Sequence, residues 1–455
     1  MLQTIVNAWK IADLRKKLLY TALIVLIFRI GSAIPVPFTA IAEEGIIGAN
    51  AAAGNTFLNY LNMMTGDAFN YGTIFAMSIT PYINSSIIMQ LLAVAIPALE
   101  RLQKEGEEGR KKIASITRFV TIALGLLQST AYYFYLRSGG TTAPTFLVTD
   151  PATGANYTGF AGVFQALVII LCFTAGTALI MWLGEQINEK GIGNGISMIL
   201  FAGIVSRIPT LLTQIINYMT YGSVYYFLSP LVLLILVAMI AFIVWMDNAE
   251  RRVPVQYAKR VVGRKMYGGQ STHIPIKVNM SGVMPVIFAS SILSLPPTIE
   301  MFVGSKIKAD GFWDKFFGVF APTHWAYAII YFVFIIGFAY FYASIQYNPI
   351  EMSKNIRDNG GSIPGIRPGE PTSRYIGKIL HRITLLGALL LSVVALFPIV
   401  FSQVTTFILE KVGHPQGMNI SLGGTSIIIL VGVALETVKQ LESQMMMRHY
   451  KGFLD

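Results

Sequence analysis

Charged residues are scarce in this sequence of 455 residues. Only 13% are Asp, Glu, Lys or Arg, against about 25% in soluble globular domains. Hydrophobic residues make up 54% of the chain and its mean hydropathy is +0.59, so too few polar side chains remain to cover a water-soluble particle of this mass. The composition therefore argues against an ordinary soluble enzyme and predicts a membrane protein.

Side chains that ligate metals or attack substrates are equally sparse. Cys172 is the only cysteine, which excludes an internal disulfide and a thiolate cluster. The five histidines show no metal-ligand spacing, and the chain lacks both a G-x-x-x-x-G-K-[ST] phosphate loop and a G-x-S-x-G nucleophile elbow. These absences argue against a membrane-embedded hydrolase, and we expect neither a catalytic reaction nor a metal or other cofactor.

Ten apolar stretches are long enough to cross a hydrocarbon layer of about 30 Å as helices. They lie near 18–37, 72–98, 115–136, 161–184, 194–217, 228–246, 280–300, 323–345, 382–402 and 421–438. The first follows basic residues as a signal peptide does, but it lacks a small-residue cleavage site, so we expect it to remain as a span. An even number of spans places both termini on one side.

Basic residues gather on the side of the termini. In this topology 26 of the 34 Lys and Arg are assigned to that side, including Arg382 at the edge of its span. Six are assigned to the other side, including Arg207, and Arg29 and Arg118 are left within spans. The positive-inside rule makes the side of the termini cytoplasmic. That face also holds 15 acidic residues, so its net charge is +11.

Two cytoplasmic loops, residues 247–279 and 346–381, are longer and more basic than the others, and both contain several Gly and Pro. Most basic loops serve only to set the orientation of a membrane protein. We expect these two to protrude and to contact an acidic partner in the cytosol, such as ribosomal RNA or a soluble protein.

The segment between the first two spans contains no Lys or Arg. Within it, residues 55–69 form an amphipathic stretch too short to cross the membrane. This stretch is either a helix lying on the bilayer surface or a short helix folded back into the protein, where irregular backbone is tolerated only beside protein or a water-filled cavity. The residues alone leave both possibilities open.

The second and seventh spans share a short pattern. Aligning their prolines brings four identical pairs into register: Pro81 with Pro285, Ile83 with Ile287, Ser86 with Ser290 and Ile88 with Ile292. Spans five positions apart are symmetry mates in a protein built from two inverted five-span halves, so the pattern predicts halves at residues 1–220 and 221–455. Chance similarity between two proline-containing helices is the alternative.

A solute transporter with inverted repeats would share this architecture. Ion-coupled transporters usually hold ionisable residues at mid-membrane, and here Arg29 is the one deep charge. An apolar constriction is the other possibility, to which Ile79 and Ile83, four residues apart on one helical face, could contribute. Lipid or core packing is the plainer explanation of any single isoleucine.

Six stretches resemble the SecY family of protein-translocation channels, in that family's order and across nearly the whole chain. They are MSITPYINSSIIMQLL (77–92), LERLQKEGEEGRKKI (99–113), MWLGEQINEKGIGNGIS (181–197), KVNMSGVMPVIFASSI (277–292), PGIRPGEPT (364–372) and SLGGTSIIILV (421–431). The second and fifth are the most specific, because a generic membrane helix does not explain such strings. Ser78 and Phe38 depart from the family pattern, which usually has Gly at both positions.

The resemblance implies an all-α polytopic membrane protein, in which ten transmembrane helices form two inverted five-helix halves around a central pore. An apolar ring and a re-entrant plug helix would close the pore. By this resemblance the ring falls on Ile79, Ile83, Ile196, Leu200, Ile287 and Ile429, and the plug on Phe57, Leu58, Leu61, Met63 and Met64. A lateral gate would lie between the second and seventh spans, with Asn84, Gln128 and Ser290 as polar candidates.

The implied function is to pass unfolded secretory proteins across the bacterial plasma membrane and to release hydrophobic segments laterally into it. The implied partners are the SecA ATPase, the ribosome, small subunits like SecE and SecG, signal peptides, nascent secretory chains and membrane lipid. Arg367 matches the family's critical arginine, although a loop arginine can also serve only to bind a nearby carbonyl. The same docking face for SecA or the ribosome would include Arg251, Arg252, Lys259, Arg260, Arg264 and Lys265.

Overall fold

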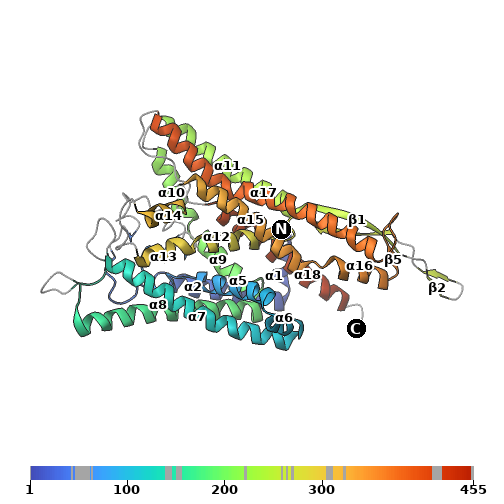
Figure 1. The fold of residues 1–455 in the computed structure, drawn as a ribbon, viewed down its shortest axis with the longest axis horizontal. Coiled ribbons are helices and arrows are strands. Elements are labelled where there is room, and N and C mark those ends of the chain that lie inside the picture. Colours follow the sequence, from blue (N-terminus) through green and yellow to red (C-terminus); the bar gives the residue numbers. More distant parts are fainter. Residues whose placement is uncertain are drawn as a thin grey trace.

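The computed structural model describes residues 2–41, 45–46, 62, 65–138, 146–149, 156–219, 223–257, 260–262, 265–267, 271–303, 311–320, 324–411 and 423–451. Within these residues, helices run along an elongated molecule, and a small group of strands projects from one end (Figure 1). The helical architecture agrees with the expected all-α fold, and the strands are confined to the loops that were expected to protrude.

Eight helices are described before residue 220. They are α1 (Leu2–Lys10), α2 (Ala12–Gly31), α5 (Thr80–Ala95), α6 (Pro97–Lys104), α7 (Glu107–Ser138), α8 (Gly159–Lys190), α9 (Gly195–Val205) and α10 (Ile208–Met219). Helix α7 contacts α5 and α8, and α9 packs against α8. This half of the chain therefore forms a continuous bundle.

The remaining elements include all the described strands. They are α11 (Ser223–Asn248), β1 (Glu250–Tyr257), β2 (Arg260–Val262), β3 (Lys265–Tyr267), β4 (Ser271–Lys277), α12 (Met284–Leu293), α13 (Leu295–Val303), α14 (Phe312–Val319), α15 (Trp325–Gln346), α16 (Pro349–Asp358), β5 (Gly361–Ser362), α17 (Glu370–Lys411) and α18 (Gly424–Lys451). Helix α15 packs between α12 and α17, while α18 contacts both α17 and α9. The last helix thus joins the two halves.

Each expected span coincides with a helix or a pair of helices. Among the described residues, seven helices are long and apolar enough to cross a membrane, and the bent pair α5 and α6 makes an eighth. The other two expected spans correspond to α2, in which Arg15, Lys16, Lys17 and Arg29 interrupt the apolar run, and to the shorter apolar stretch Met284–Ile299. The structure is consistent with ten spans, although two fall short of this criterion of length and composition.

The second expected span begins later than its apolar run does. Residues 66–79 form turns, and helix α5 starts at Thr80 with Pro81 in its first turn, a position where the missing proline N–H costs nothing. A proline also sets the end of α5. Ile96 is extended (φ −108°, ψ 112°) ahead of Pro97, and α6 turns away by 106°, because the residue before proline disfavours the helical region.

The two basic loops fold together into one unit. Strand β1 lies between β4 and β5 in an antiparallel sheet, with Gln256 opposite Ser271 on one side and Ser362 on the other. Beneath it lies a separate buried core with members from both loops: Val253, Val255, Ile276, Met280, Ile356, Ile363, Ile376 and Leu380. The β2–β3 hairpin extends beyond this sheet at the tip of the molecule (Figure 1). We call this sheet and its core the cytoplasmic unit, after the side on which the charge distribution of the sequence predicts these loops.

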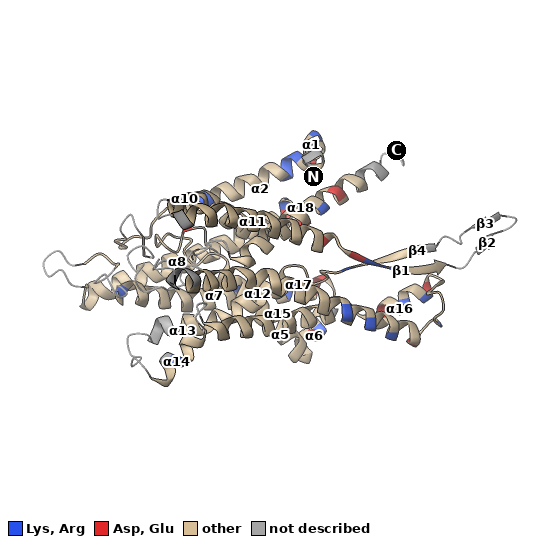
Figure 2. Cartoon of the chain, turned by 90° about the horizontal axis from the view of Figure 1, so that it is seen from above, with Lys and Arg blue, Asp and Glu red and all other residues tan. Residues whose placement is uncertain are grey.

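The chain ends lie in the same half of the molecule as the cytoplasmic unit, where most Lys and Arg also gather (Figure 2). Helix α1 packs against α18 through a small buried cluster of Ala8, Leu14, Ile192 and Leu441. This common end agrees with the charge distribution expected from the sequence.

Candidate functional site

The six expected ring residues come together in the central hydrophobic cluster of the molecule. Ile79, Leu200, Ile287 and Ile429 are buried members of that cluster, and Ile83 and Ile196 are partly buried against it. They are contributed by α5 and its N-cap and by α9, α12 and α18. This cluster therefore contains or contacts ring candidates from both halves of the sequence.

Local helix geometry explains why Ile79 and Ile83 share one face of their helix, and why Ile196 and Leu200 share one face of α9. The Ile83 N–H donates to the Ile79 carbonyl at 3.1 Å, so these two side chains lie one turn apart on the same face. Ile196 and Leu200 have the same spacing at the start of α9. Each helix thus contributes two apolar side chains to the same region.

The Gly-rich string before α9 fixes where that helix begins. The Asn194 side chain accepts from the backbone N–H groups of Ile196 and Ser197, and the Asn188 side chain accepts from Gly195 N–H at 2.8 Å. A Cβ at Gly195 would lie 1.9 Å from the Gly184 carbonyl oxygen of α8. Only glycine therefore allows α9 to pack at this distance, and this packing places Ile196 and Leu200.

The central cluster is tightly closed. Ile79, Leu200 and Ile429 expose 1%, 2% and 0% of their surfaces. Water therefore hardly reaches these three side chains in the conformation described. An ion at this level would lose its hydration shell without gaining a polar partner.

The seam between the second and seventh spans is also closed. Helix α12 contacts α5, and α13 contacts α7. Asn84 is buried on α5, and its Nδ2 finds no hydrogen-bond partner among the described residues. Ser290 is buried on α12 but bonds within its own helix, to the Ile287 carbonyl at 3.0 Å. Neither side chain bridges the seam in this state.

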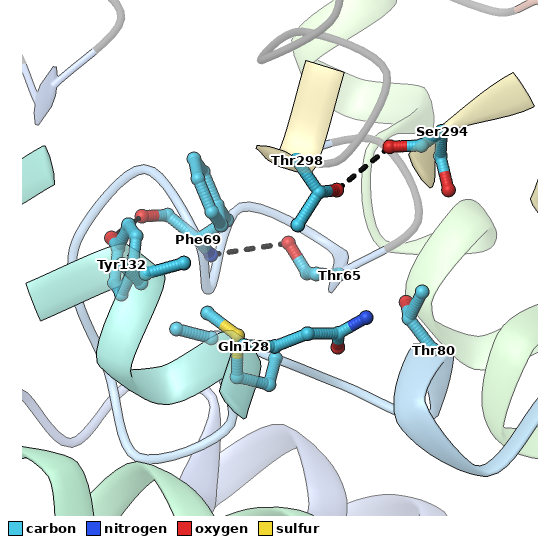
Figure 3. Close-up of a pocket in the computed structure, with 10 residues that line it drawn as sticks. Thr65, Phe69, Thr80, Gln128, Tyr132, Ser294 and Thr298 are labelled. Carbon is cyan, nitrogen blue, oxygen red and sulfur yellow. Dashed lines mark hydrogen bonds between the residues drawn. The ribbon is translucent and has the colours of Figure 1, made fainter. Parts of the chain in front are cut away.

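Gln128, the third gate candidate, lines a pocket between α7, α13 and the turns before α5, and neither Asn84 nor Ser290 lines that pocket (Figure 3). Thr65, Thr80, Ser294 and Thr298 line the same pocket. The Thr298 hydroxyl donates to the Ser294 carbonyl at 2.7 Å. Sequence reasoning missed these hydroxyl residues because serine and threonine are common in membrane helices.

A polar contact that the sequence did not predict joins three segments beside the central cluster. Arg29 on α2 donates to the Gly66 carbonyl at 3.0 Å and to the Ser206 hydroxyl at 3.3 Å. Next to it, Arg207 and Asp67 form an ion pair at 3.5 Å. We call these five residues the arginine clasp. It ties the turns after residue 65 to α2 and to the break between α9 and α10.

The expected plug residues Phe57, Leu58, Leu61, Met63 and Met64 lie outside the described residues, as do Lys259 and Arg264 of the expected docking face. Arg260 is the first residue of β2, and Lys265 is the first residue of β3. Arg251 and Arg252 are exposed on β1, ahead of the buried Val253. Arg252 pairs with Glu250 at 2.7 Å.

Arg367 is exposed on the loop between β5 and α17. Its carbonyl accepts from the Thr372 hydroxyl at 2.8 Å, and the Ser353 hydroxyl donates to the Gly369 carbonyl at 2.8 Å. Within the described part of the chain, the guanidinium itself forms no hydrogen bond or ion pair. The loop is therefore held by other groups, and the Arg367 side chain is left available.

The described residues contain no group of three His, Cys, Asp or Glu side chains that could hold a metal ion. The candidate site is instead an apolar closure between helices, with hydroxyl and amide side chains beside it. Such a site can open or seal a passage by moving helices.

The SecY family model matches residues 73–438 of the chain. A Mycobacterium tuberculosis protein named protein translocase subunit SecY is 41% identical over 460 residues, and one from Streptomyces coelicolor is 42% identical over 458 residues; each alignment covers all of both chains.

Solved structures with the same fold include one titled "The structure of a protein conducting channel", with a TM-score of 0.60, 17% identity and coverage of 94% of this chain and 92% of that one. Another, "Sec61 in the Canine ribosome-channel complex from the endoplasmic reticulum", has a TM-score of 0.56, 16% identity and the same coverage.

Proposed function

This chain belongs to the SecY family, and we propose that it is the channel subunit through which a bacterial translocase passes unfolded secretory proteins. It is a multi-pass membrane protein. The observation that carries the proposal is that one hydrophobic cluster buries four of the six ring candidates and packs against the other two, with members from both halves of the sequence. An apolar ring can block ions at rest and still yield to a passing chain, because packing contacts have no directional bonds to break.

The two halves, residues 1–220 and 221–455, would separate at the seam between α5 and α12. A hydrophobic segment in the pore could then move sideways into lipid. Asn84, Gln128 and Ser290 would lie along that route. The unpaired amide of Asn84 supports this role, since a buried polar group without a partner weakens the closed packing by about 1–3 kcal/mol.

The plug would be the segment containing Phe57, Leu58, Leu61, Met63 and Met64. One structural relative is titled for a plug domain that stabilises its closed state and maintains a membrane seal. In this chain Gly66 and Asp67 of the arginine clasp follow shortly after Met64, so the clasp would hold the end of this segment in place. If so, Asp67→Asn should increase the resting ion conductance of bilayers that contain the channel, and an unchanged conductance would remove the clasp from the seal.

The exposed arginines of the cytoplasmic unit would dock the SecA ATPase or the ribosome. One relative is named for a ribosome-channel complex. Arg251, Arg252 and Arg367 are exposed on this unit, and Lys259, Arg260, Arg264 and Lys265 belong to the same loop of the sequence. Small subunits like SecE and SecG, signal peptides and nascent chains would complete the set of partners.

The proposed orientation of the protein in the membrane follows from the position of the cytoplasmic unit. A docking surface for cytosolic partners requires this end to face the cytoplasm, and the termini lie in the same half of the molecule (Figure 2). The basic residues gathered there agree with the positive-inside rule. The protein would therefore reside in the bacterial plasma membrane with both termini cytoplasmic.

Crosslinking from a stalled secretory chain tests the path. In a Cys172→Ser background, Ile79→Cys, Ile83→Cys and Ile287→Cys should each crosslink to one cysteine placed in the stalled chain. Val333→Cys on α15, where Val333 is 57% exposed, provides a lipid-facing control. Equal crosslinking at Val333 and at the ring, or none at the ring, would contradict the proposal.

A further inference from the structure

Helix α14 carries an exposed aromatic surface that the channel mechanism does not use. Its sequence, FWDKFFGV, places Phe312, Trp313, Phe316 and Phe317 on one side and Lys315 on the other. Phe317 is buried and pins the helix to the bundle, while Phe312, Trp313 and Phe316 expose 76%, 60% and 40% of their surfaces. This is an amphipathic helix with its apolar side largely uncovered.

The aromatic rings hold one another in place. The Phe312 and Phe316 ring centroids are 6.4 Å apart, those of Trp313 and Phe317 are 6.1 Å apart, and those of Phe316 and Phe320 are 5.4 Å apart. Such pairs are favourable beyond their buried area. The surface is therefore already ordered before anything covers it.

The position of α14 identifies what covers it. It packs beside α13 and α15, at the end of the bundle opposite the strands (Figures 1 and 2). Helix α15 begins at Trp325, and Trp325, Ile329 and Val333 expose 59%, 65% and 57% of their surfaces at successive turns. On a membrane-spanning helix such a stripe faces lipid. Helix α14 contacts α15 and ends at Val319, six residues before α15 begins, so it lies near the N-terminal end of a lipid-facing helix.

We infer that α14 is an interfacial membrane anchor, with Phe312, Trp313 and Phe316 in the boundary between lipid headgroups and acyl chains. Aromatic side chains concentrate at this depth, and an amphipathic helix lies there with its charged side toward water. Lys315 is on that charged side and is exposed. The lipid contact does not depend on the channel function, whereas assigning it to the outer leaflet rests on the proposed orientation.

The anchor has a consequence for the gate. Helix α14 contacts α13, and Thr298 of α13 lines the pocket with Gln128, as does Ser294 just before that helix (Figure 3). An anchored α14 would hold the external end of α13 at a constant membrane depth. Lipids in that leaflet would thereby act on the gate through the contact between α14 and α13.

Tryptophan fluorescence tests the inference. In the full chain, Trp9, Trp182, Trp245 and Trp325 are replaced by Phe, which leaves Trp313 as the reporter, and the protein is placed in phosphatidylcholine bilayers with or without bromine on the upper acyl chain. Bromine should lower the emission of Trp313 about twofold, because an interfacial ring lies within reach of those atoms. The matched control adds Trp313→Phe and Lys315→Trp, which puts the reporter on the charged side of the same helix; this reporter should keep its emission in brominated lipid and be quenched by aqueous iodide.

Equal quenching of both reporters by iodide, with none by bromine, would overturn the inference. Shielding of Trp313 only after a second protein is added would also overturn it, in favour of a protein interface. If the fourfold variant does not fold, Trp313→Phe alone in the otherwise native chain should remove a bromine-quenched part of the emission. The measurement does not involve secretory transport. A result that overturns the membrane anchor would therefore leave the proposed channel function untouched.

Discussion

At the residue scale, the two positions where the sequence departs from the family's glycines have a common geometry. Phe38 and Ser78 hold φ values of 66° and 49°, in the left-handed region that glycine adopts without cost. A side chain there costs roughly 1–2 kcal/mol. Ser78 directly precedes the expected ring residue Ile79, so this strain lies at the start of the closure.

Relief of that strain is measurable by thermal unfolding. Ser78→Gly should stabilise the protein by up to about 1 kcal/mol, because the relieved strain exceeds the extra freedom of the unfolded chain. Ser86→Gly, one to two turns into α5, is the matched control and should destabilise by about 0.5 kcal/mol. A loss of stability in both variants would mean that Ser78 is not strained.

The arginine clasp marks the limit of sequence reasoning at this scale. Arg29 could be recognised as a deep charge, but its partners could not be found, because Gly66 contributes a backbone carbonyl and Ser206 is distant in the chain. Helix periodicity could suggest Ile79 and Ile83 for a constriction, but the six ring positions could be named as a set only through the family resemblance. Hydropathy alone does not distinguish Ile79 or Ile429 from any other buried isoleucine.

Arg367 is a residue whose role can be separated from folding. Its guanidinium is exposed and its loop is held by Thr372 and Ser353, so Arg367→Glu should leave the protein inserted and stable. We expect SecA-dependent export into vesicles to fall about tenfold, as reversal of a docking charge predicts. Arg357→Glu, an exposed arginine of α16, is the control, and normal export in the Arg367 variant would refute the docking role.

At the scale of elements, the helices were predictable and the cytoplasmic unit was not. A span is a local property of about 20 apolar residues, so the ten stretches could be located one at a time. The pairing of β1 with β5 joins Gln256 to Ser362 across more than a hundred residues, and no local pattern reports it. Both loops were expected to protrude, but the core that they share was not predicted.

That shared core predicts coupling between the loops. Val255 is fully buried beneath the sheet, and Val255→Ala should destabilise the unit by about 2 kcal/mol. Limited proteolysis should then cut faster within 346–381 as well as within 247–279, although only the first loop is altered. Arg251→Ala, at an exposed position of β1, should change neither rate; faster cutting confined to the first loop would show that the loops fold independently.

At the scale of the whole molecule, a low charge content and a one-sided surplus of basic residues describe how the chain sits in a membrane. The apolar helices converge on one central cluster. The basic residues gather toward the end of the molecule that carries the cytoplasmic unit (Figure 2). An opening between α5 and α12 would therefore connect a docking surface, a pore and the lipid within one chain. The central claim is that the six-residue ring seals this pore.

Conductance of planar bilayers tests that claim most directly. Ile83→Asn places a hydrated amide in the ring and should raise the resting ion conductance about tenfold, because a wetted constriction no longer excludes ions. Ile88→Asn makes the same change on the same helix at an exposed, lipid-facing position and should leave the conductance at the level of the unaltered protein. A ring variant that stays as tight as this control would contradict the account.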